Sequence, residues 1–289
     1  MDLKQPISGV LSIALIATAL SVHAVIWDRD REQSNAKALA ENLDFGQVIW
    51  IPENSNHKFP AIYTPSGPYG GNYAVILLHS MGGHPDWPVV ISPLRKSFRY
   101  SNWSTLSLQL PVLDPVRNSS DYGRTLQEAA SRIGSGIDYL HQMGHEHVYL
   151  VGYGFGATAA AYYLDQNHNQ VVPGFVAISI LARKFLNPKV DVMDLLKHID
   201  IPVLDIYASN DQKTVVQSAV DRRLAINNGD TSKFTQIEIP DTDHLYTNST
   251  SELYHAIHQW LEQTAGINEN RVTSQDTDGG EEIIPQGVQ

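Results

Sequence analysis

Two residues that could perform acid–base chemistry stand just after strand-like runs of the sequence. Asp211 follows the run at 204–207, and His244 follows the run at 237–239. A carboxylate that orients an imidazole makes the imidazole a general base, which can activate an oxygen nucleophile. Asp211 could also be ordinary turn chemistry, since it ends the tripeptide Ser209-Asn210-Asp211, and His244 could be a surface loop residue. We expect a dyad, because functional groups of open parallel sheets gather beyond the carboxyl ends of the strands.

A glycine-rich segment indicates where the attacking atom would stand. Gly152-Tyr153-Gly154-Phe155-Gly156 joins the strand-like run at 147–151 to a helix of small residues at 156–164. A sharp turn between strand and helix is typical of a nucleophile elbow, in which the acid and the histidine follow the apex residue along the chain. The apex here is Gly154, so we expect a vacant nucleophile position. The sequence holds no cysteine that could replace the missing hydroxyl.

Two motifs together resemble a known superfamily. The turn His79-Ser80-Met81-Gly82-Gly83 and the elbow Gly-Tyr-Gly-Phe-Gly-Ala are similar to those of α/β hydrolases, and more narrowly to the bacterial family of unknown function DUF3530. The resemblance covers residues 73–261. It implies a single α/β domain with a mostly parallel central sheet, covered by helices on both faces.

The resemblance also implies an oxyanion hole. Its first backbone N–H would lie near Ser80 or Met81, and the second would be that of Phe155, the residue after the apex. Ser80 itself could be a displaced nucleophile. It follows a different strand from the elbow, so we expect a backbone role for it.

The glycine at the apex decides between two functions. Without a hydroxyl or thiol no acyl-enzyme can form there, and we expect a degenerate, non-catalytic hydrolase homologue that binds a small molecule or an envelope ligand. The alternative is an unconventional hydrolase, in which Asp211 orients His244 and the imidazole activates a water in the space beside Gly154. The sequence does not identify the substrate.

A dinucleotide-binding function is a third, less favoured hypothesis. Gly152-x-Gly154-x-x-Ala157 fits the fingerprint of that class. The acidic residue expected about 20 positions later is absent, because the run at 178–181 leads into Ala182-Arg183-Lys184. We expect no cofactor. His79, His84 and Asp86 match no strong metal-site spacing and are interpreted as loop residues.

Strands and helices alternate through most of the chain, which predicts a parallel sheet covered on both faces. The buried run Tyr73–Leu78 is typical of a central strand, and Ser249-x-x-Glu252 predicts a capping box at the start of the last helix. We expect the segments 85–99 and 182–191 to shape specificity. Strands are predicted at 47–52, 57–65, 73–78, 104–110, 147–151, 171–181, 201–208 and 234–239, and helices at 122–143, 156–164, 192–199, 215–226 and from 249.

The two ends of the chain differ from the predicted domain at 47–265. Residues 1–24 read as a signal peptide, with Lys4, an apolar core and a Val22-His23-Ala24 cleavage site. A retained membrane anchor is the alternative; after cleavage we expect no stable membrane span. Residues 25–46 are interpreted as a linker or short helix, and residues 266–289 as a disordered acidic tail.

Composition favours one cellular location and excludes one class of partner. An exported animal domain of this size would often carry disulfides, so an exported chain without cysteines fits the bacterial envelope better. The formal net charge is −11, and no cluster of basic residues offsets it. A polyanion would be repelled, so we expect no nucleic-acid binding.

Overall fold

The computed structural model describes residues 27–53, 56–67, 71–168, 172–182, 184, 186–226 and 231–267. The predicted signal peptide and nearly all of the predicted acidic tail lie outside these ranges. The strands are β1 (Gln47–Pro52), β2 (Lys58–Thr64), β3 (Tyr73–Leu78), β4 (Trp103–Leu108), β5 (His147–Tyr153), β6 (Phe175–Ile178), β7 (Val203–Asn210) and β8 (Phe234–Asp243). The α-helices are α1 (Arg29–Asn42), α2 (Ile91–Phe98), α3 (Leu126–Gln142), α4 (Phe155–Gln166), α5 (Val192–Lys197), α6 (Lys213–Gln217), α7 (Ala219–Ala225) and α8 (Thr250–Thr264), and short 3-10 helices stand at Ser119–Thr125 and Thr231–Lys233.

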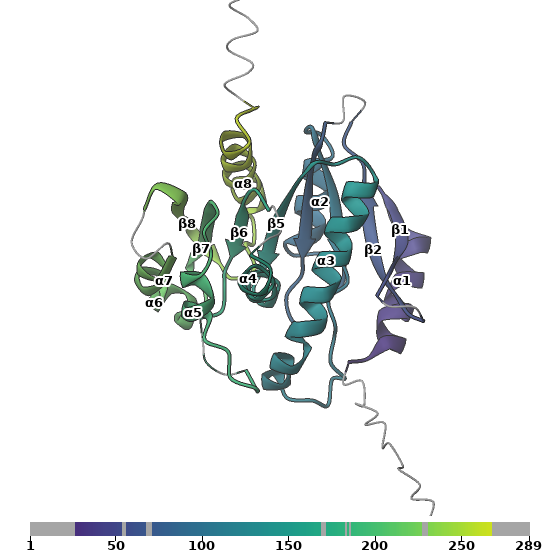
Figure 1. The fold of residues 1–289 in the computed structure, drawn as a ribbon, viewed down its shortest axis with the longest axis horizontal. Coiled ribbons are helices and arrows are strands. Elements are labelled where there is room, and N and C mark those ends of the chain that lie inside the picture. The colour runs from purple at the N-terminus through teal and green to yellow at the C-terminus, as the bar shows by residue number, and fades with distance from the viewer. Residues whose placement is uncertain are drawn as a thin grey trace, which may run out of the picture.

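The eight strands form one sheet in the order β1-β2-β4-β3-β5-β6-β7-β8 (Figure 1). β1 and β2 pair antiparallel, as do β2 and β4, whereas the strands from β4 to β8 run parallel. The carboxyl ends of β3 and β5 to β8 therefore meet at one edge of the sheet. This arrangement confirms the predicted α/β fold with a mostly parallel sheet.

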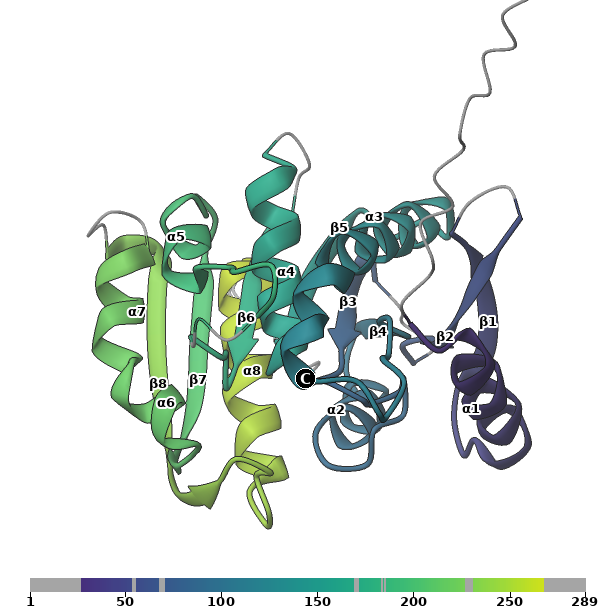
Figure 2. The same cartoon turned by 90° about the horizontal axis from the view of Figure 1, so that it is seen from below.

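Helices cover the sheet on both faces (Figure 2). α3, α4, α5 and α7 pack together on one face, and α2 and α8 pack on the other. The central strand β3 shows why its run is wholly apolar: Ala74, Ile76 and Leu78 enter one core, while Val75 and Leu77 enter the other. A strand that is buried on both faces favours apolar side chains on both faces.

The segment before the sheet folds as the helix α1 and packs on β1 and β2. Its Glu32 is buried and accepts a bond from Val112 N at 3.2 Å. Arg132 of α3, fully buried, pairs with Glu32 at 3.0 Å and with Glu53 at 2.7 Å. A buried charge needs such partners, so α1 is held to the domain by this network.

One helix was not predicted, and one expectation about local structure was wrong. The segment at 85–99 contains the helix α2, in which Leu94 and Phe98 pack into the core shared with α8. α8 does begin after Ser249, but the Ser249 side chain makes no capping bond. Its ψ of 21° departs from the extended backbone of a typical N-cap. Within the described ranges, no helix is long and apolar enough to cross a membrane.

Candidate functional site

A hollow of about 590 Å³ opens beyond the carboxyl ends of the parallel strands. Ser80 follows β3, Leu181 follows β6, Gln212 follows β7 and His244 follows β8, so the hollow lies where the sheet brings four loops together. This is the crevice in which open α/β sheets place their ligands. The lining residues are Ser80, Met81, Asn118, Ser119, Ser120, Leu181, Gln212, Thr214 and His244.

The structure brings Asp211 and His244 together as the sequence suggests. His244 Nδ1 lies 2.7 Å from Asp211 Oδ1. The Asp211 side chain is fully buried, whereas 20% of the His244 side chain is exposed. Tyr153, the last residue of β5, also contacts the histidine. Its hydroxyl donates to His244 O at 3.0 Å, and the centroids of the two rings lie 5.3 Å apart.

Hydrogen bonds hold Asp211 in its charged form. Burial alone would raise its pKa, but bonds from His244 and Ser179 outweigh burial and lower the pKa below the usual value. Gln212 N donates to Oδ1 at 2.7 Å, and Ala208 N donates to Oδ2 at 3.3 Å. An ionised carboxylate only accepts hydrogen bonds, so the proton between the pair is on His244 Nδ1.

Two residues that sequence reasoning missed support this carboxylate. Ser179 Oγ donates to Asp211 Oδ2 at 2.5 Å, and the Tyr246 hydroxyl lies 2.9 Å from Ser179 Oγ. Both residues have a left-handed backbone, with φ of 49° for Ser179 and 53° for Tyr246. Such conformations are costly for residues other than glycine and cluster at functional sites. Ser179 follows β6, so the strand-end rule that identified Asp211 would have found it; no pattern points to Tyr246.

The elbow has the sharp turn that the glycine pattern predicts. Gly154 has φ 55° and ψ −112° and leads directly into α4. Gly156 lets the end of β3 pass close to the elbow, because a Cβ at Gly156 would overlap the carbonyl oxygen of Leu78. The residues after β3 therefore lie against the apex of the elbow.

The space beside Gly154 is filled rather than vacant. A Cβ built on Gly154 would lie deep inside van der Waals contact with Ser80 Oγ, and 3.2 Å from Ser80 Cβ. Phe155 N donates to Ser80 Oγ at 3.4 Å. The hydroxyl of Ser80 thus reaches, from the loop after β3, the place where an apex residue would carry its side chain. The expected backbone role describes only part of what Ser80 does.

The turn that carries Ser80 is fixed by a buried histidine. His79 Nδ1 donates to Ser80 O at 2.7 Å, while Leu110 N donates to His79 Nε2 at 3.0 Å. Burial lowers the pKa of His79 to about 3, so the ring is neutral and its tautomer is set by these bonds. Gly83 N also donates to Ser80 O, at 3.1 Å.

The side chains of His84 and Asp86, the other two candidate metal ligands, each bond to a protein group. Asp86 pairs with Arg95 at 2.8 Å, and His84 Nδ1 accepts from Asp86 N at 3.2 Å. Among the described residues, no group of three or more His, Asp or Glu side chains is placed to hold a metal ion. These side chains shape the loop after β3.

Of the expected oxyanion donors, Phe155 N points at the Ser80 oxygen, and Met81 lines the same hollow as Ser80. Phe155 begins α4, whose N-terminus carries partial positive charge. An oxygen that develops negative charge beside Ser80 would therefore meet the positive end of a helix.

The segments expected to shape specificity contribute little. The lining includes no described residue of 85–99 or 182–191, although Leu181 borders the second. The segment 85–99 does not reach the hollow, because its helix α2 packs on the face of the sheet opposite to α4. The wall is instead made by 118–120, before α3.

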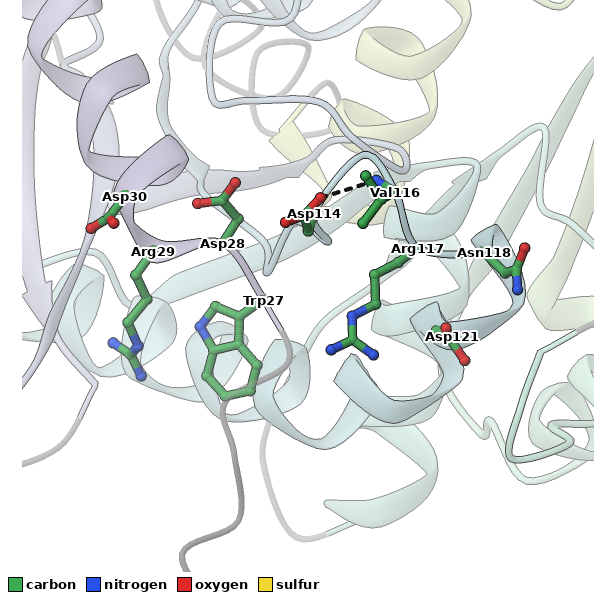
Figure 3. A pocket seen from close by; sticks show the side chains of 9 residues that line it. All are labelled: Trp27, Asp28, Arg29, Asp30, Asp114, Val116, Arg117, Asn118 and Asp121. Carbon is green, nitrogen blue, oxygen red and sulfur yellow. Dashed lines mark hydrogen bonds between the residues drawn. The ribbon is translucent and has the colours of Figure 1, made fainter.

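A second hollow, of about 700 Å³, lies between the start of α1 and the loop before α3 (Figure 3). Asn118 borders both hollows, but neither Asp211 nor His244 lines this one. No histidine and no hydroxyl side chain of the described residues lines it, so we place the chemistry at the first hollow. Its lining residues are Trp27, Asp28, Arg29, Asp30, Asp114, Val116, Arg117, Asn118 and Asp121.

Comparison with solved structures supports the fold. Est1E from Butyrivibrio proteoclasticus superposes with a TM-score of 0.62 at 13% identity, covering 76% of this chain and 99% of that one. An α/β serine hydrolase without lid from Xanthomonas campestris gives 0.58 at 14% identity, covering 76% and 96%. A monoacylglycerol lipase from Paleococcus ferrophilus gives 0.53 at 15% identity, covering 71% and 98%. At such low identities these similarities show the fold alone.

Sequence comparison identifies the family. No curated protein matches the sequence significantly. The model of the family "Protein of unknown function (DUF3530)" matches residues 27–121 and 114–263, a stretch that runs from α1 to α8 and includes the elbow and the dyad. The chain therefore belongs to the DUF3530 family and has the α/β-hydrolase fold.

Proposed function

We propose that this protein hydrolyses carboxylic esters, with His244 as the general base and Asp211 as the residue that orients it. The hydrogen bond of 2.7 Å between the two, at the wall of the hollow, carries the proposal. Because Asp211 accepts a hydrogen bond from the Nδ1–H of His244, the neutral ring presents Nε2 as its basic nitrogen. A general base of this kind accelerates a reaction about 10²- to 10⁴-fold.

The supporting shell favours catalysis over a degenerate site. Ser179 and Tyr246 hold strained backbone conformations while they support Asp211. Strain of this kind costs about 1–3 kcal/mol per residue, and a domain that had lost its chemistry would gain stability by relaxing it.

The lining indicates the kind of ester. No described residue that lines the hollow is an Asp, Glu, Lys or Arg. Met81 and Leu181 are apolar, and the others offer neutral hydroxyl and amide groups. An anionic substrate would lose its hydration without gaining a cationic partner, so we propose an uncharged acyl group and alcohol.

Ligand binding without turnover is the second candidate, and Gly154 favours it. Glycine supplies no attacking atom, so the same hollow would hold a neutral molecule unchanged. The dinucleotide hypothesis gains no support, because the chain after β6 leads into Ala182-Arg183-Lys184 and offers no acidic residue for a ribose.

The test is hydrolysis of short p-nitrophenyl esters by the purified protein. We expect wild type to be active, and His244→Ala and Asp211→Asn to lower kcat/KM at least 100-fold. His255→Ala, which removes an exposed histidine of α8, is the matched control and should leave the rate unchanged. A wild type that turns over no neutral ester, or a His244→Ala variant as active as wild type, would contradict the proposal.

We further propose that the protein acts in the bacterial periplasm after cleavage behind Ala24. The support is the sequence pattern of Lys4, an apolar core and Val22-His23-Ala24. Fractionation followed by N-terminal sequencing should find a soluble periplasmic chain that begins at Val25. A chain that retains Met1 in the membrane pellet would instead indicate a signal anchor.

A further inference from the structure

The hydroxyl of Ser80 stands where the elbow lacks an attacking atom. We infer that Ser80 Oγ is the nucleophile of this enzyme, delivered by the loop after β3 instead of by the elbow at Gly154. The inference rests on the proposed ester hydrolysis and names the atom that attacks. It distinguishes this site from one in which His244 activates a water.

The position of the hydroxyl is the first argument. Ser80 Oγ lies against Gly154 so closely that a Cβ at Gly154 would overlap it. Ser80 also lines the same hollow as His244. A serine at the apex would carry its hydroxyl on that Cβ, so the Ser80 hydroxyl occupies the immediate surroundings in which an elbow nucleophile would stand.

The rigidity of the turn is the second argument. The Ser80 carbonyl accepts two hydrogen bonds, from His79 Nδ1 at 2.7 Å and from Gly83 N at 3.1 Å. His79 is fully buried and neutral at physiological pH, because burial lowers its pKa to about 3. Its Nε2 is anchored by Leu110 N. A nucleophile needs such a fixed position, since misplacement by about 1 Å costs orders of magnitude in rate.

The direction of the hydroxyl proton is the third argument. Phe155 N–H donates to Ser80 Oγ, so this side of the oxygen is used as an acceptor and its own proton can be given elsewhere. His244 carries its proton on Nδ1 toward Asp211, which leaves Nε2 as an acceptor. Ser80 therefore has a proton to give, and His244 has the lone pair that takes it.

The reaction then follows with atoms and protons in balance. Ser80 Oγ bonds to the carbonyl carbon of the ester, its proton passes to His244 Nε2, and the carbonyl π electrons move to oxygen. When this oxyanion collapses, the carbon–oxygen bond to the alcohol breaks and His244 returns the proton to the leaving alkoxide. Water repeats the sequence on the Ser80 ester: His244 takes its proton, the acid is released and Ser80 regains its hydrogen.

The first experiment is covalent labelling with a fluorophosphonate. In this step Ser80 Oγ bonds to phosphorus, fluoride leaves and the proton passes to His244. We expect one label per chain, mapped to Ser80 by mass spectrometry, lost in Ser80→Ala and formed at least 100-fold more slowly in His244→Ala. Ser97→Ala, a half-buried serine of α2 outside the hollow, should label like wild type. No label on wild type, or a label on another residue, would overturn the inference.

The second experiment uses the absence of cysteine in the chain. Ser80→Cys introduces a single thiol, whose pKa is read from the pH dependence of alkylation by iodoacetamide. Beside His244 the thiolate gains a cationic partner, so the pKa should fall at least one unit below the ordinary value of about 8.5. The shift should vanish in Ser80→Cys with His244→Ala, and it should be absent in Ser97→Cys. An ordinary pKa in Ser80→Cys would count against the inference.

These experiments separate the inference from the proposed function. If Ser80→Ala keeps the wild-type rate of ester hydrolysis while His244→Ala loses it, the enzyme is a hydrolase that activates water, and the inference fails alone. If wild type cleaves no ester but Ser80 is labelled in a His244-dependent way, the nucleophile stands and the proposed substrate class fails. Thermal melts of every variant ensure that a lost label reflects chemistry and not unfolding.

Discussion

Gly154 and Ser80 share one space, so substitutions at the two positions should not act independently. Gly154→Ser adds a Cβ that overlaps Ser80 Oγ, at a backbone φ of 55° that side chains rarely adopt. Ser80→Ala removes the overlapping oxygen and leaves Ser80 Cβ at 3.2 Å from the new atom, a distance that a shift of a few tenths of an ångström relieves. The double variant should therefore be more stable than the sum of the two changes predicts.

The magnitudes follow from the separate costs. The positive φ costs about 1–3 kcal/mol, and overpacking costs about 1–3 kcal/mol, so Gly154→Ser should lose about 2–6 kcal/mol of unfolding free energy. Ser80→Ala alone loses one hydrogen bond from Phe155 N, about 0.5–1.5 kcal/mol. In the double variant only the overpacking cost disappears, which gives a coupling of about 1–3 kcal/mol.

Urea unfolding of wild type, the two single variants and the double variant measures this coupling. Substitutions at sites that do not touch change the unfolding free energy additively, to within about 0.5 kcal/mol. A coupling below that limit would refute the placement of the Ser80 hydroxyl beside Gly154, and with it the geometric basis for its role. The double variant also moves the hydroxyl to the elbow, so we expect it to recover part of the ester hydrolysis that Ser80→Ala loses.

Three further predictions concern the groups that support the site and the sheet. Burial and the neighbouring Glu53 raise the pKa of Glu128 from 4.5 to about 7; the folded chain then holds an extra proton between these values, and stability should fall as pH rises through that window. Glu128→Gln should remove this pH dependence, which urea titrations between pH 5 and 8 measure. If the unfolding free energy of the variant changes with pH as much as that of wild type, the prediction is wrong. Arg132→Met should cost about 3–5 kcal/mol, because it leaves the buried Glu32 carboxylate without its cation, whereas Glu53 keeps Arg29; a loss under about 1 kcal/mol would show that Glu32 is stable there without a cation. Ser179→Ala should cost about 1.5–3 kcal/mol, since it removes a bond to the charged Asp211, and a variant as stable as wild type in urea would argue against that bond.

Much of the fold could be predicted from the sequence because it depends on local patterns. The unbroken apolar run at 73–78 can only be buried on both faces, and β3 has these bounds. The helix α2 escaped prediction because its eight residues include a proline and two cations. Its burial depends on Arg95, which is fully buried and pairs with Asp86, a contact that periodicity does not contain.

The sequence by itself determined where the dyad could form. Asp211 and His244 each follow a strand, and parallel strands necessarily bring their carboxyl ends to one edge. That rule is independent of any side-chain detail, which is why the pair could be expected without a structure. The apex glycine Gly154 is equally local, since its positive φ sets the angles of a single turn.

Only the tertiary structure decided what lies beside Gly154. Ser80 belongs to another strand, and its hydroxyl reaches the elbow because Gly156 lets the end of β3 come close and because His79 fixes the turn. The support of Asp211 by Ser179 has the same origin in residues far apart along the chain. Local patterns fix where a strand ends, but contacts between loops depend on packing distances, and these exist only once the sheet has formed.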